Sequence, residues 1–100
     1  MTVDIIIPVY NAATLLRRCL DALDRHTLPA QARVTVIDDA SPDPQIAALL
    51  SDWQQRSPLR PQLLRNASNL GFVGSVNRGI AASSGDVLLL NADTEVTPDW

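Results

Sequence analysis

Apolar residues alternate along the chain between short continuous runs and longer stretches with helical spacing. The runs lie at residues 5–7, 34–37, 62–65 and 87–90, and they consist mainly of Ile, Val and Leu. Continuous apolar runs of this length are typical of buried strands. We therefore expect four strands, the first ending at Pro8, the one at 62–65 the weakest and the one at 87–90 the most apolar.

Between the runs, apolar residues spaced three or four apart predict three helices. Their expected inner faces are Leu15, Leu16, Cys19, Leu20 and Leu23, then Ile46, Leu49, Leu50 and Trp53, and finally Phe72, Val76 and Ile80. Asn11 or Thr14 is available to cap the first helix. Asp43 is the expected cap of the second, because Pro44 after it suits the first helical position.

Strands and helices alternate throughout, and this order predicts one domain over residues 1–100, a parallel α/β sheet with helices on both faces. In such sheets, ligands bind beyond the carboxyl ends of the strands. The residues at those ends are Pro8, Tyr10 and Asn11, then Asp38 and Asp39, and finally Asn91 and Asp93. We expect a binding site there.

Composition and charge exclude several classes of function. The chain has 46% hydrophobic and 19% charged residues, as in ordinary globular domains. All eight basic residues are arginine, which excludes a P-loop lysine and a Schiff-base lysine. A net charge of −3 argues against nucleic-acid binding, which needs clustered positive charge. Cys19, the only cysteine, is expected in the core, and His26 is assigned no role.

The sequence also bears on the compartment. No apolar run approaches the roughly 20 residues that span a bilayer, and the first residues lack the basic region of a signal peptide. We therefore expect a cytoplasmic protein.

Carboxylates at the ends of two strands are expected to converge on one crevice. Two such charges about 4 Å apart repel by ~4 kcal/mol at an effective dielectric constant of about 20. A divalent cation that bridges a carboxylate and a diphosphate relieves this repulsion and replaces the missing lysine. Each acid alone is also consistent with a loop cap or a turn. The combination of Asp38, Asp39 and Asp93 favours the cation.

Other residues near the strand ends suit a nucleotide. Tyr10 offers an aromatic face to a base, and a carboxylate after the second strand can accept the ring N–H of a uracil-like or thymine-like base. Gly71 at the start of the third helix lets backbone N–H groups or the Asn69 side chain approach a ligand. Arg78 reaches either a diphosphate or solvent. Packed rings, capped turns and surface side chains are the structural alternatives.

Four segments together resemble a known family. Residues 4–12, 36–43, 69–79 and 85–94 have the order and spacing of a family 2 glycosyltransferase, especially of its rhamnosyltransferase-like branch. The resemblance implies a GT-A fold with a Rossmann-like sheet, a nucleoside-diphosphate sugar linked to UDP, dTDP or GDP, Mg²⁺ or Mn²⁺, and inversion at the anomeric carbon. It also implies that Pro8 and Tyr10 line the nucleoside pocket, Asp39 bonds the base, Asp38 supports that loop and Asp93 reaches the metal.

The sequence departs from the family at Asn91 and Ala92, where many members carry another acid. The resemblance implies that the catalytic base lies beyond Trp100, together with the site for a saccharide or lipid-linked acceptor. We therefore expect this chain to be a truncated nucleotide-binding half that transfers no sugar by itself. Association with the inner face of the membrane and homodimerisation through an exposed sheet edge are left open.

Three other classes compete with this interpretation. A receiver-type phosphoacceptor domain uses a lysine, and the chain has none. A nucleotidyltransferase usually has a glycine-rich, basic loop after its first strand, and residues 8–12 are neither. A non-catalytic nucleotide-binding or structural α/β module remains open.

Overall fold

A computed structural model of the chain describes residues 2–98 and 100. Its elements, in order, are β1 (Val3–Val9), α1 (Ala13–His26), β2 (Ala32–Asp38), α2 (Pro44–Arg56), β3 (Gln62–Arg65), α3 (Gly71–Ala81) and β4 (Val87–Leu89). The predicted α/β class and the predicted order of elements are confirmed. Of the helices described, none is long and apolar enough to cross a membrane.

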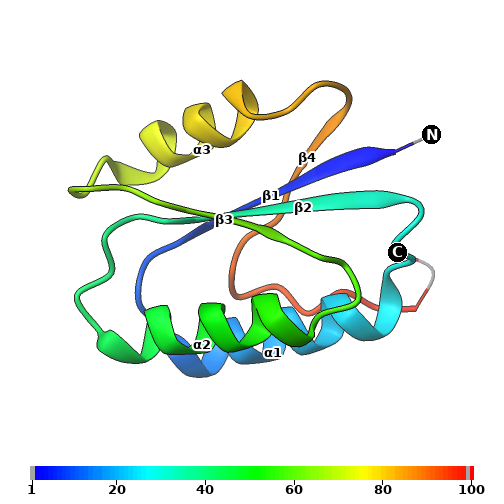
Figure 1. Ribbon diagram of the computed structural model, residues 1–100, viewed down its shortest axis with the longest axis horizontal. Coiled ribbons are helices and arrows are strands. Elements are labelled where there is room, and N and C mark those ends of the chain that lie inside the picture. Colours follow the sequence, from blue (N-terminus) through cyan, green and yellow to red (C-terminus); the bar gives the residue numbers. More distant parts are fainter. Residues whose placement is uncertain (1, 99) are drawn as a thin grey trace.

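The four strands form one parallel sheet in the order β3-β2-β1-β4. Helices α1 and α2 cover one face and α3 covers the other (Figure 1), so the prediction of helices on both faces is confirmed. Successive connections move from β1 to β2 to β3, and the last returns to the far side of β1. The sheet thus grows on one side of β1 with β2 and β3, and on the other side with β4. The carboxyl ends of β1 and β4 therefore flank a topological switch point, where sheets of this kind bind ligands.

Strand β1 continues through Pro8, where the sequence predicted its end. The Leu90 N–H donates to the Ile6 carbonyl at 3.0 Å, so the backbone of Ile6 faces β4. Backbone groups alternate along a strand, and the Pro8 nitrogen therefore faces the same side. Pairing with β4 ends at Leu89, opposite Ile6. The missing N–H of proline consequently costs no hydrogen bond between strands.

Large apolar side chains fill the space between the sheet and helices α1 and α2. This core includes Ile5, Ile7, Val9, Leu16, Cys19, Leu20, Leu23, Val34, Val36, Ile46, Leu50 and Trp53. The predicted burial of Cys19 and of the α2 stripe is confirmed. The predicted burial of Leu15 is wrong, because it is 43% exposed. Leu15 lies about 100° around the helix from Leu16, which places it beside the buried stripe.

The α3 face of the sheet is packed with small residues. The buried residues of α3 are Ser75, Val76 and Gly79, whereas Phe72 and Ile80 are 58% and 47% exposed. Only Val76 of the predicted stripe is therefore correct. A Cβ atom on Gly79 would lie 2.5 Å from Ile6 Cγ2, so the helix approaches the sheet closely. Bulky side chains on this face of the helix would prevent that approach.

At the carboxyl edge of the sheet, the starts of α1 and α2 differ. Asp43 Oδ1 accepts a hydrogen bond from the Gln45 N–H at 2.9 Å, and Pro44 is the first residue of α2, as predicted. Helix α1 instead follows Ala12, which has a φ of 61° and makes no side-chain cap. The predicted cap by Asn11 or Thr14 is therefore wrong, because Asn11 Oδ1 accepts from the Asp43 N–H instead.

Candidate functional site

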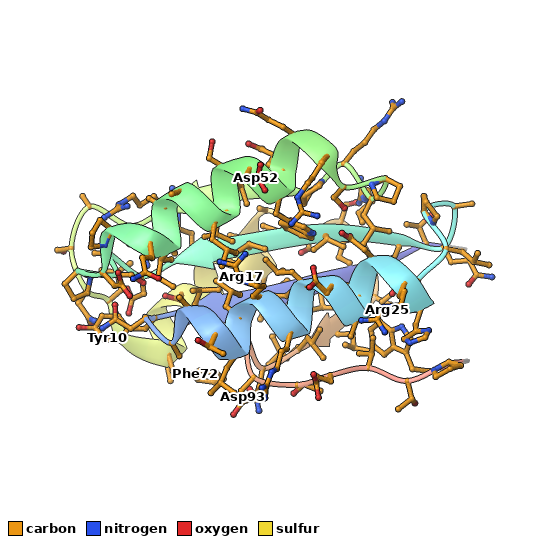
Figure 2. The ribbon with its side chains drawn as sticks, turned by 90° about the horizontal axis from the view of Figure 1, so that it is seen from below. Tyr10, Arg17, Arg25, Asp52, Phe72 and Asp93 are labelled. Carbon is orange, nitrogen blue, oxygen red and sulfur yellow. The ribbon has the colours of Figure 1, made fainter. Side chains whose placement is uncertain are left out.

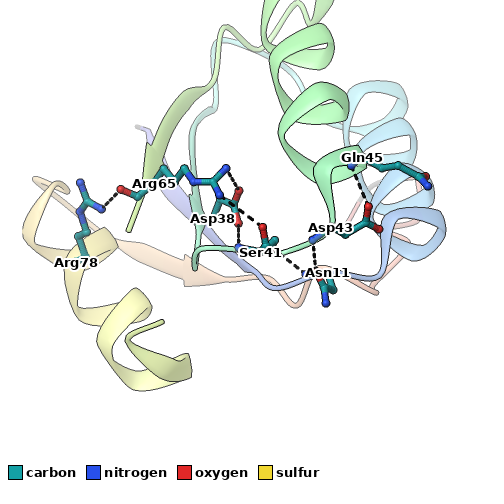
Figure 3. Close-up of polar contacts among 7 residues, drawn as sticks. All are labelled: Asn11, Asp38, Ser41, Asp43, Gln45, Arg65 and Arg78. Atoms are coloured by element: carbon teal, nitrogen blue, oxygen red, sulfur yellow. Dashed lines mark hydrogen bonds and ion pairs between the residues drawn. The ribbon is translucent and has the colours of Figure 1, made fainter. Parts of the chain in front are cut away.

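Asn11 joins the loop after β1 to the loop after β2, and Asp38 joins the loop after β2 to β3 (Figure 3). The Asn11 N–H donates to Ser41 Oγ at 2.9 Å, and Asn11 Oδ1 accepts from the Asp43 N–H at 3.2 Å. The buried Asp38 carboxylate accepts from the Ser41 N–H at 3.0 Å and pairs with Arg65 Nη1 at 3.4 Å. Asn11 thus holds the loop between β2 and α2 against the end of β1, whereas Asp38 holds the same loop against β3.

The Asp39 carboxylate lies at the N-terminus of α3. Its Oδ1 accepts from Asn66 Nδ2 at 2.8 Å and from the Leu70 N–H at 2.7 Å, while Oδ2 accepts from the Gly71 N–H at 3.0 Å. Negative charge at this position also complements the helix dipole. A carboxylate oxygen accepts about two hydrogen bonds. Oδ2 therefore retains one acceptor position, although the whole residue is only 5% exposed.

Hydrogen-bond donors decide the charge state of Asp39. Burial by itself raises the pKa of the Asp39 carboxyl, but hydrogen bonds from Leu70, Asn66, Gly71 and Ser75 favour the charged form. The net effect is a pKa below the usual range. Asp39 is therefore ionised near neutral pH.

The acids at the strand ends do not form the predicted cluster. Donors surround Asp39, Arg65 pairs with Asp38, and no hydrogen bond among the described residues joins Tyr10, Asp39 and Asp93. Among residues 2–98 and 100, no three His, Cys, Asp or Glu side chains form a group that could hold a metal ion. Mutual repulsion of these acids therefore does not call for a cation.

Asn66 is a site residue that the sequence analysis did not identify. It is 2% exposed, and its Nδ2 bonds both Asp39 and, at 3.0 Å, Ser75 Oγ. Its Oδ1 accepts from Arg78 Nη1 at 2.7 Å, and Arg78 also donates to the Arg65 carbonyl at 2.8 Å. Arg78 thus contacts the end of β3. Asn66 follows β3 directly, and the carboxyl ends of parallel strands lie at one edge of a sheet. This position in the sequence could have identified Asn66 as a site residue.

Of the four described non-glycine residues with positive φ, three lie at the same edge, and Arg60 lies between α2 and β3. Asn11, Ala12 and Ala40 have φ values of 53°, 61° and 57°, and Gly71, at the start of α3, has a φ of 80°. Non-glycine residues in this left-handed region cost about 1–3 kcal/mol each and occur often at ligand-binding sites. The loops after β1 and β2 are therefore held in conformations that local preferences disfavour.

Tyr10 and Asp93 present their side chains to solvent near this edge. Tyr10 is 52% exposed, and Asp93 is also exposed. Figure 2 shows both in the same half of the molecule as Phe72, while Arg25 lies at the other end. An exposed aromatic ring and an exposed carboxylate thus lie on the two segments that follow β1 and β4.

Asn69 and Asn91 are also exposed. Asn69 Oδ1 accepts from the Gly71 N–H at 3.1 Å and so stabilises the start of α3. The Asn91 carbonyl accepts from the Thr94 N–H at 3.0 Å and from Cys19 Sγ at 3.8 Å. The backbone of Asn91 therefore holds the segment after β4 against helix α1.

The segment after β4 carries negative charge. Burial, and secondarily the charges of Asp93 and Glu95, raise the pKa of the Cys19 thiol to about 11. The two carboxylates thus act on the same buried group in the middle of α1. Oxygen ligands of this kind suit a hard divalent cation that takes its remaining ligands from phosphates and water.

A cavity of about 820 Å³ opens at the opposite edge of the sheet. It is lined by the starts of β1 and β2 and by Arg25, His26, Leu88 and Trp100. None of the site residues predicted from the sequence lines this cavity. We place the candidate site at the carboxyl edge, because the switch point, the strained loops and the convergent polar groups all lie there.

Comparison with known proteins assigns the chain to a family. Residues 4–100 match the family described as glycosyl transferase family 2. The amylovoran biosynthesis glycosyltransferase AmsB of Erwinia amylovora is 34% identical over 92 residues, which cover 91% of this chain and 30% of AmsB. The chain thus spans about a third of that relative.

Solved structures share the fold. The mannosyltransferase PcManGT of Pyrobaculum calidifontis, in complex with GDP-Man and Mn²⁺, is 28% identical with a TM-score of 0.81, over 91% of this chain and 27% of that protein. S. aureus TarS residues 1–349, in complex with UDP-GlcNAc, give a TM-score of 0.81 at 23% identity, over 93% of this chain and 27% of TarS. With the matched family and the parallel sheet, these similarities establish that the chain belongs to glycosyl transferase family 2 and has the Rossmann-like fold of the nucleotide-binding half of GT-A enzymes.

Proposed function

We propose that this chain binds a nucleoside-diphosphate sugar at the carboxyl edge of its sheet. In the complete protein, the sugar would pass with inversion to a hydroxyl of a saccharide or lipid-linked acceptor. The main support is the Asp39 carboxylate, which is ionised and held by Asn66, Leu70 and Gly71, with only one of these three bonds on Oδ2. A fixed anionic acceptor of this kind suits a ring N–H.

In this proposal, two residues recognise the base. Tyr10, which is half exposed after β1, stacks on the ring. Asp39 Oδ2 accepts the ring N–H that uracil, thymine and guanine all possess. Pro8 and Asn11 shape the pocket beneath the base, and Asp38 supports the loop that carries Asp39.

The diphosphate would lie between the start of α3 and the segment after β4. The side chains of Asn69 and Asn91 supply neutral polar groups there, and Gly71 leaves open space for a close approach. Arg78 is not assigned to the diphosphate, because its guanidinium bonds Asn66 and the Arg65 carbonyl.

Asp93 would hold a divalent cation, Mg²⁺ or Mn²⁺, together with diphosphate oxygens. When bound, such a cation supplies positive charge that stabilises the leaving diphosphate. Asp93 fits this role because it is exposed and lies on the segment that follows β4. Few protein ligands beside phosphates are usual for Mg²⁺.

Transfer also needs a base that takes the proton of the acceptor hydroxyl. We propose that this base lies beyond Trp100, since AmsB is about three times as long as the matched region. The 100-residue chain would then bind the donor nucleotide without transferring sugar. Measurable sugar transfer by the purified chain would contradict this part of the proposal.

Three finer assignments belong to the same proposal. The rhamnosyl-type donor rests on the sequence resemblance alone, as does association with the inner face of the membrane. Homodimerisation is supported by the edge strand β4, in which Val87, Leu88 and Leu89 are 37–47% exposed.

The decisive experiment is calorimetric titration of the chain with UDP, dTDP and GDP, with and without Mn²⁺. We expect one nucleotide to bind, and Mn²⁺ to increase its affinity by about tenfold or more, because the cation bridges Asp93 and the diphosphate. Asp93→Asn should abolish the increase. Asp52→Asn is the control, since Asp52 is an exposed acid that pairs with Arg56 on α2 (Figure 2). If no nucleotide binds, the chain is a structural module.

A further inference from the structure

We propose that Asn66 and Arg78 form a positioning pair, which orients the Asp39 carboxylate and thereby sets the selectivity for the base. This inference rests on the proposed function, because it concerns how the same carboxylate meets its ligand. Asn66 contacts Asp39 directly, and Arg78 is linked to Asp39 through Asn66. We infer no contact of Asn66 or Arg78 with the ligand.

Asn66 links the ends of β2 and β3 to helix α3. Its two amide hydrogens are directed to Asp39 Oδ1 and Ser75 Oγ, at 2.8 and 3.0 Å, and its carbonyl oxygen accepts from Arg78 at 2.7 Å. The side chain is almost completely buried, so water cannot replace these partners. Every polar atom of the amide is therefore committed.

Arg78 determines which way the Asn66 amide points. A guanidinium only donates hydrogen bonds, so the atom of Asn66 that faces it must be the oxygen. If the amide turned by half a rotation, its NH₂ would face Arg78 and its oxygen would face Asp39. Both contacts would then be repulsive. Arg78 is itself fixed by its second bond, to the Arg65 carbonyl at 2.8 Å.

The orientation of Asn66 in turn restricts Asp39. With donors from Asn66 and Leu70, the acceptor capacity of Oδ1 is filled, and Oδ2 keeps the only remaining position. The carboxylate cannot rotate without breaking these bonds. A fixed acceptor discriminates between bases that present a donor and bases that present an acceptor at the same place, whereas a mobile one adapts to both.

Cytosine provides the test of this selectivity. Uracil has an N–H at ring position 3, where cytosine has an unprotonated acceptor nitrogen. A carboxylate held in place accepts a hydrogen bond from the uracil N–H and repels the acceptor nitrogen of cytosine. We therefore expect the protein to bind the best of UDP, dTDP and GDP at least about tenfold more tightly than CDP, the usual factor for a hydrogen bond to a charged group.

The experiment measures this affinity ratio in folded variants. Arg78→Ala should reduce the ratio several-fold, because the Asn66 amide loses the group that fixes it. Arg78→Lys should retain part of the ratio, since an ammonium group also donates to the Asn66 oxygen. Asn66→Ala should give the largest loss. If Asn66→Ala does not fold, the two Arg78 variants still test the inference, because Arg78 lies on an exposed turn of α3.

Two controls separate positioning from stability. Ser57→Ala removes a buried hydroxyl that donates to Asp24 at 2.6 Å, at the end of α2, and should lower stability without changing the ratio. Arg17→Ala removes an exposed arginine on the other face of the sheet and should change neither (Figure 2). A wild-type ratio in the folded Arg78 and Asn66 variants would overturn this inference alone. Failure of the wild-type chain to bind any nucleotide would overturn it together with the proposed function.

Discussion

The two faces of the sheet are packed in different ways. Helices α1 and α2 bury large apolar side chains, among them Leu20 and Trp53, against one face. Helix α3 covers the other face with Ser75, Val76 and Gly79, and it leaves its large side chains exposed. Burial of a Leu, Val or Phe side chain contributes about 1.5–3 kcal/mol. Most of the apolar contribution to folding therefore comes from the α1 and α2 face.

The α3 face gains close approach instead. With small residues on its inner side, α3 brings its first N–H groups to Asp39 and its Ser75 hydroxyl to Asn66. These bonds are what hold the carboxylate after β2. The comparison indicates that one face stabilises the fold, whereas the other face positions the polar groups of the candidate site.

The largest expected effect on stability comes from a substitution on the face of the sheet that α1 and α2 cover. Trp53→Ala should lower the free energy of unfolding by about 3–5 kcal/mol, because it removes a fully buried ring and a hydrogen bond from Nε1 to Asp24. Phe72→Ala is the matched control on α3. Its ring is 58% exposed, so the loss should stay within about 0.5 kcal/mol. Urea denaturation of the three proteins measures both values, and equal losses would contradict the comparison.

The same difference explains which parts of the fold could be predicted from the sequence. Apolar spacing identified the stripes of α1 and α2 because that face is packed with large side chains. It failed on α3, where it selected Phe72 and Ile80 and passed over Gly79. Hydrophobic periodicity detects large buried residues, but a helix that packs closely through glycine and serine leaves no such pattern.

Prediction of the candidate site was limited in a related way. The order of elements was enough to place Tyr10, Asp39 and Asp93 after three strands. It did not reveal that hydrogen-bond donors, rather than a cation, compensate Asp39, because those donors come from a loop and a helix start. Their positions depend on how closely α3 packs, and the sequence pattern had not captured that.

The next effect concerns the polar bonds of the α3 face. Asp39→Asn should lower the free energy of unfolding by about 1.5–3 kcal/mol near pH 7. An amide has only one acceptor oxygen, and its NH₂ would face a buried donor. The pKa of Asp39 is lower in the folded chain than its unfolded value of about 3.9. Its charge therefore adds stability above that unfolded pKa, and this contribution is lost as the pH falls through the folded pKa.

Denaturation of the wild type and Asp39→Asn at several pH values tests this expectation. The difference between their free energies of unfolding should be largest near neutral pH. It should shrink below about pH 4, because the variant cannot ionise at this position. Asp52→Asn serves as the control, since its exposed pair with Arg56 contributes little at any pH. A difference that does not change with pH would indicate that the charge of Asp39 is unimportant and that only its shape matters.

The smallest effect tests the close approach of α3 itself. A Cβ atom on Gly79 would lie 2.5 Å from Ile6 Cγ2 and 2.9 Å from Ile37 Cδ1. The Ile37 atom ends a side chain that can turn, but the Ile6 atom is attached directly to Cβ and moves only with the strand. Overpacking of this kind costs about 1–3 kcal/mol.

Alanine also favours a helix over glycine by about 1 kcal/mol, which offsets part of the overpacking cost. We therefore expect Gly79→Ala to lower the free energy of unfolding by about 0–2 kcal/mol. Gly85→Ala is the control, because nothing lies within 4 Å of its added Cβ. If α3 moves away from the sheet in Gly79→Ala, the bonds from Leu70 and Gly71 to Asp39 should lengthen, and nucleotide affinity should fall with stability. A variant more stable than the wild type would mean that close packing of α3 does not position the carboxylate.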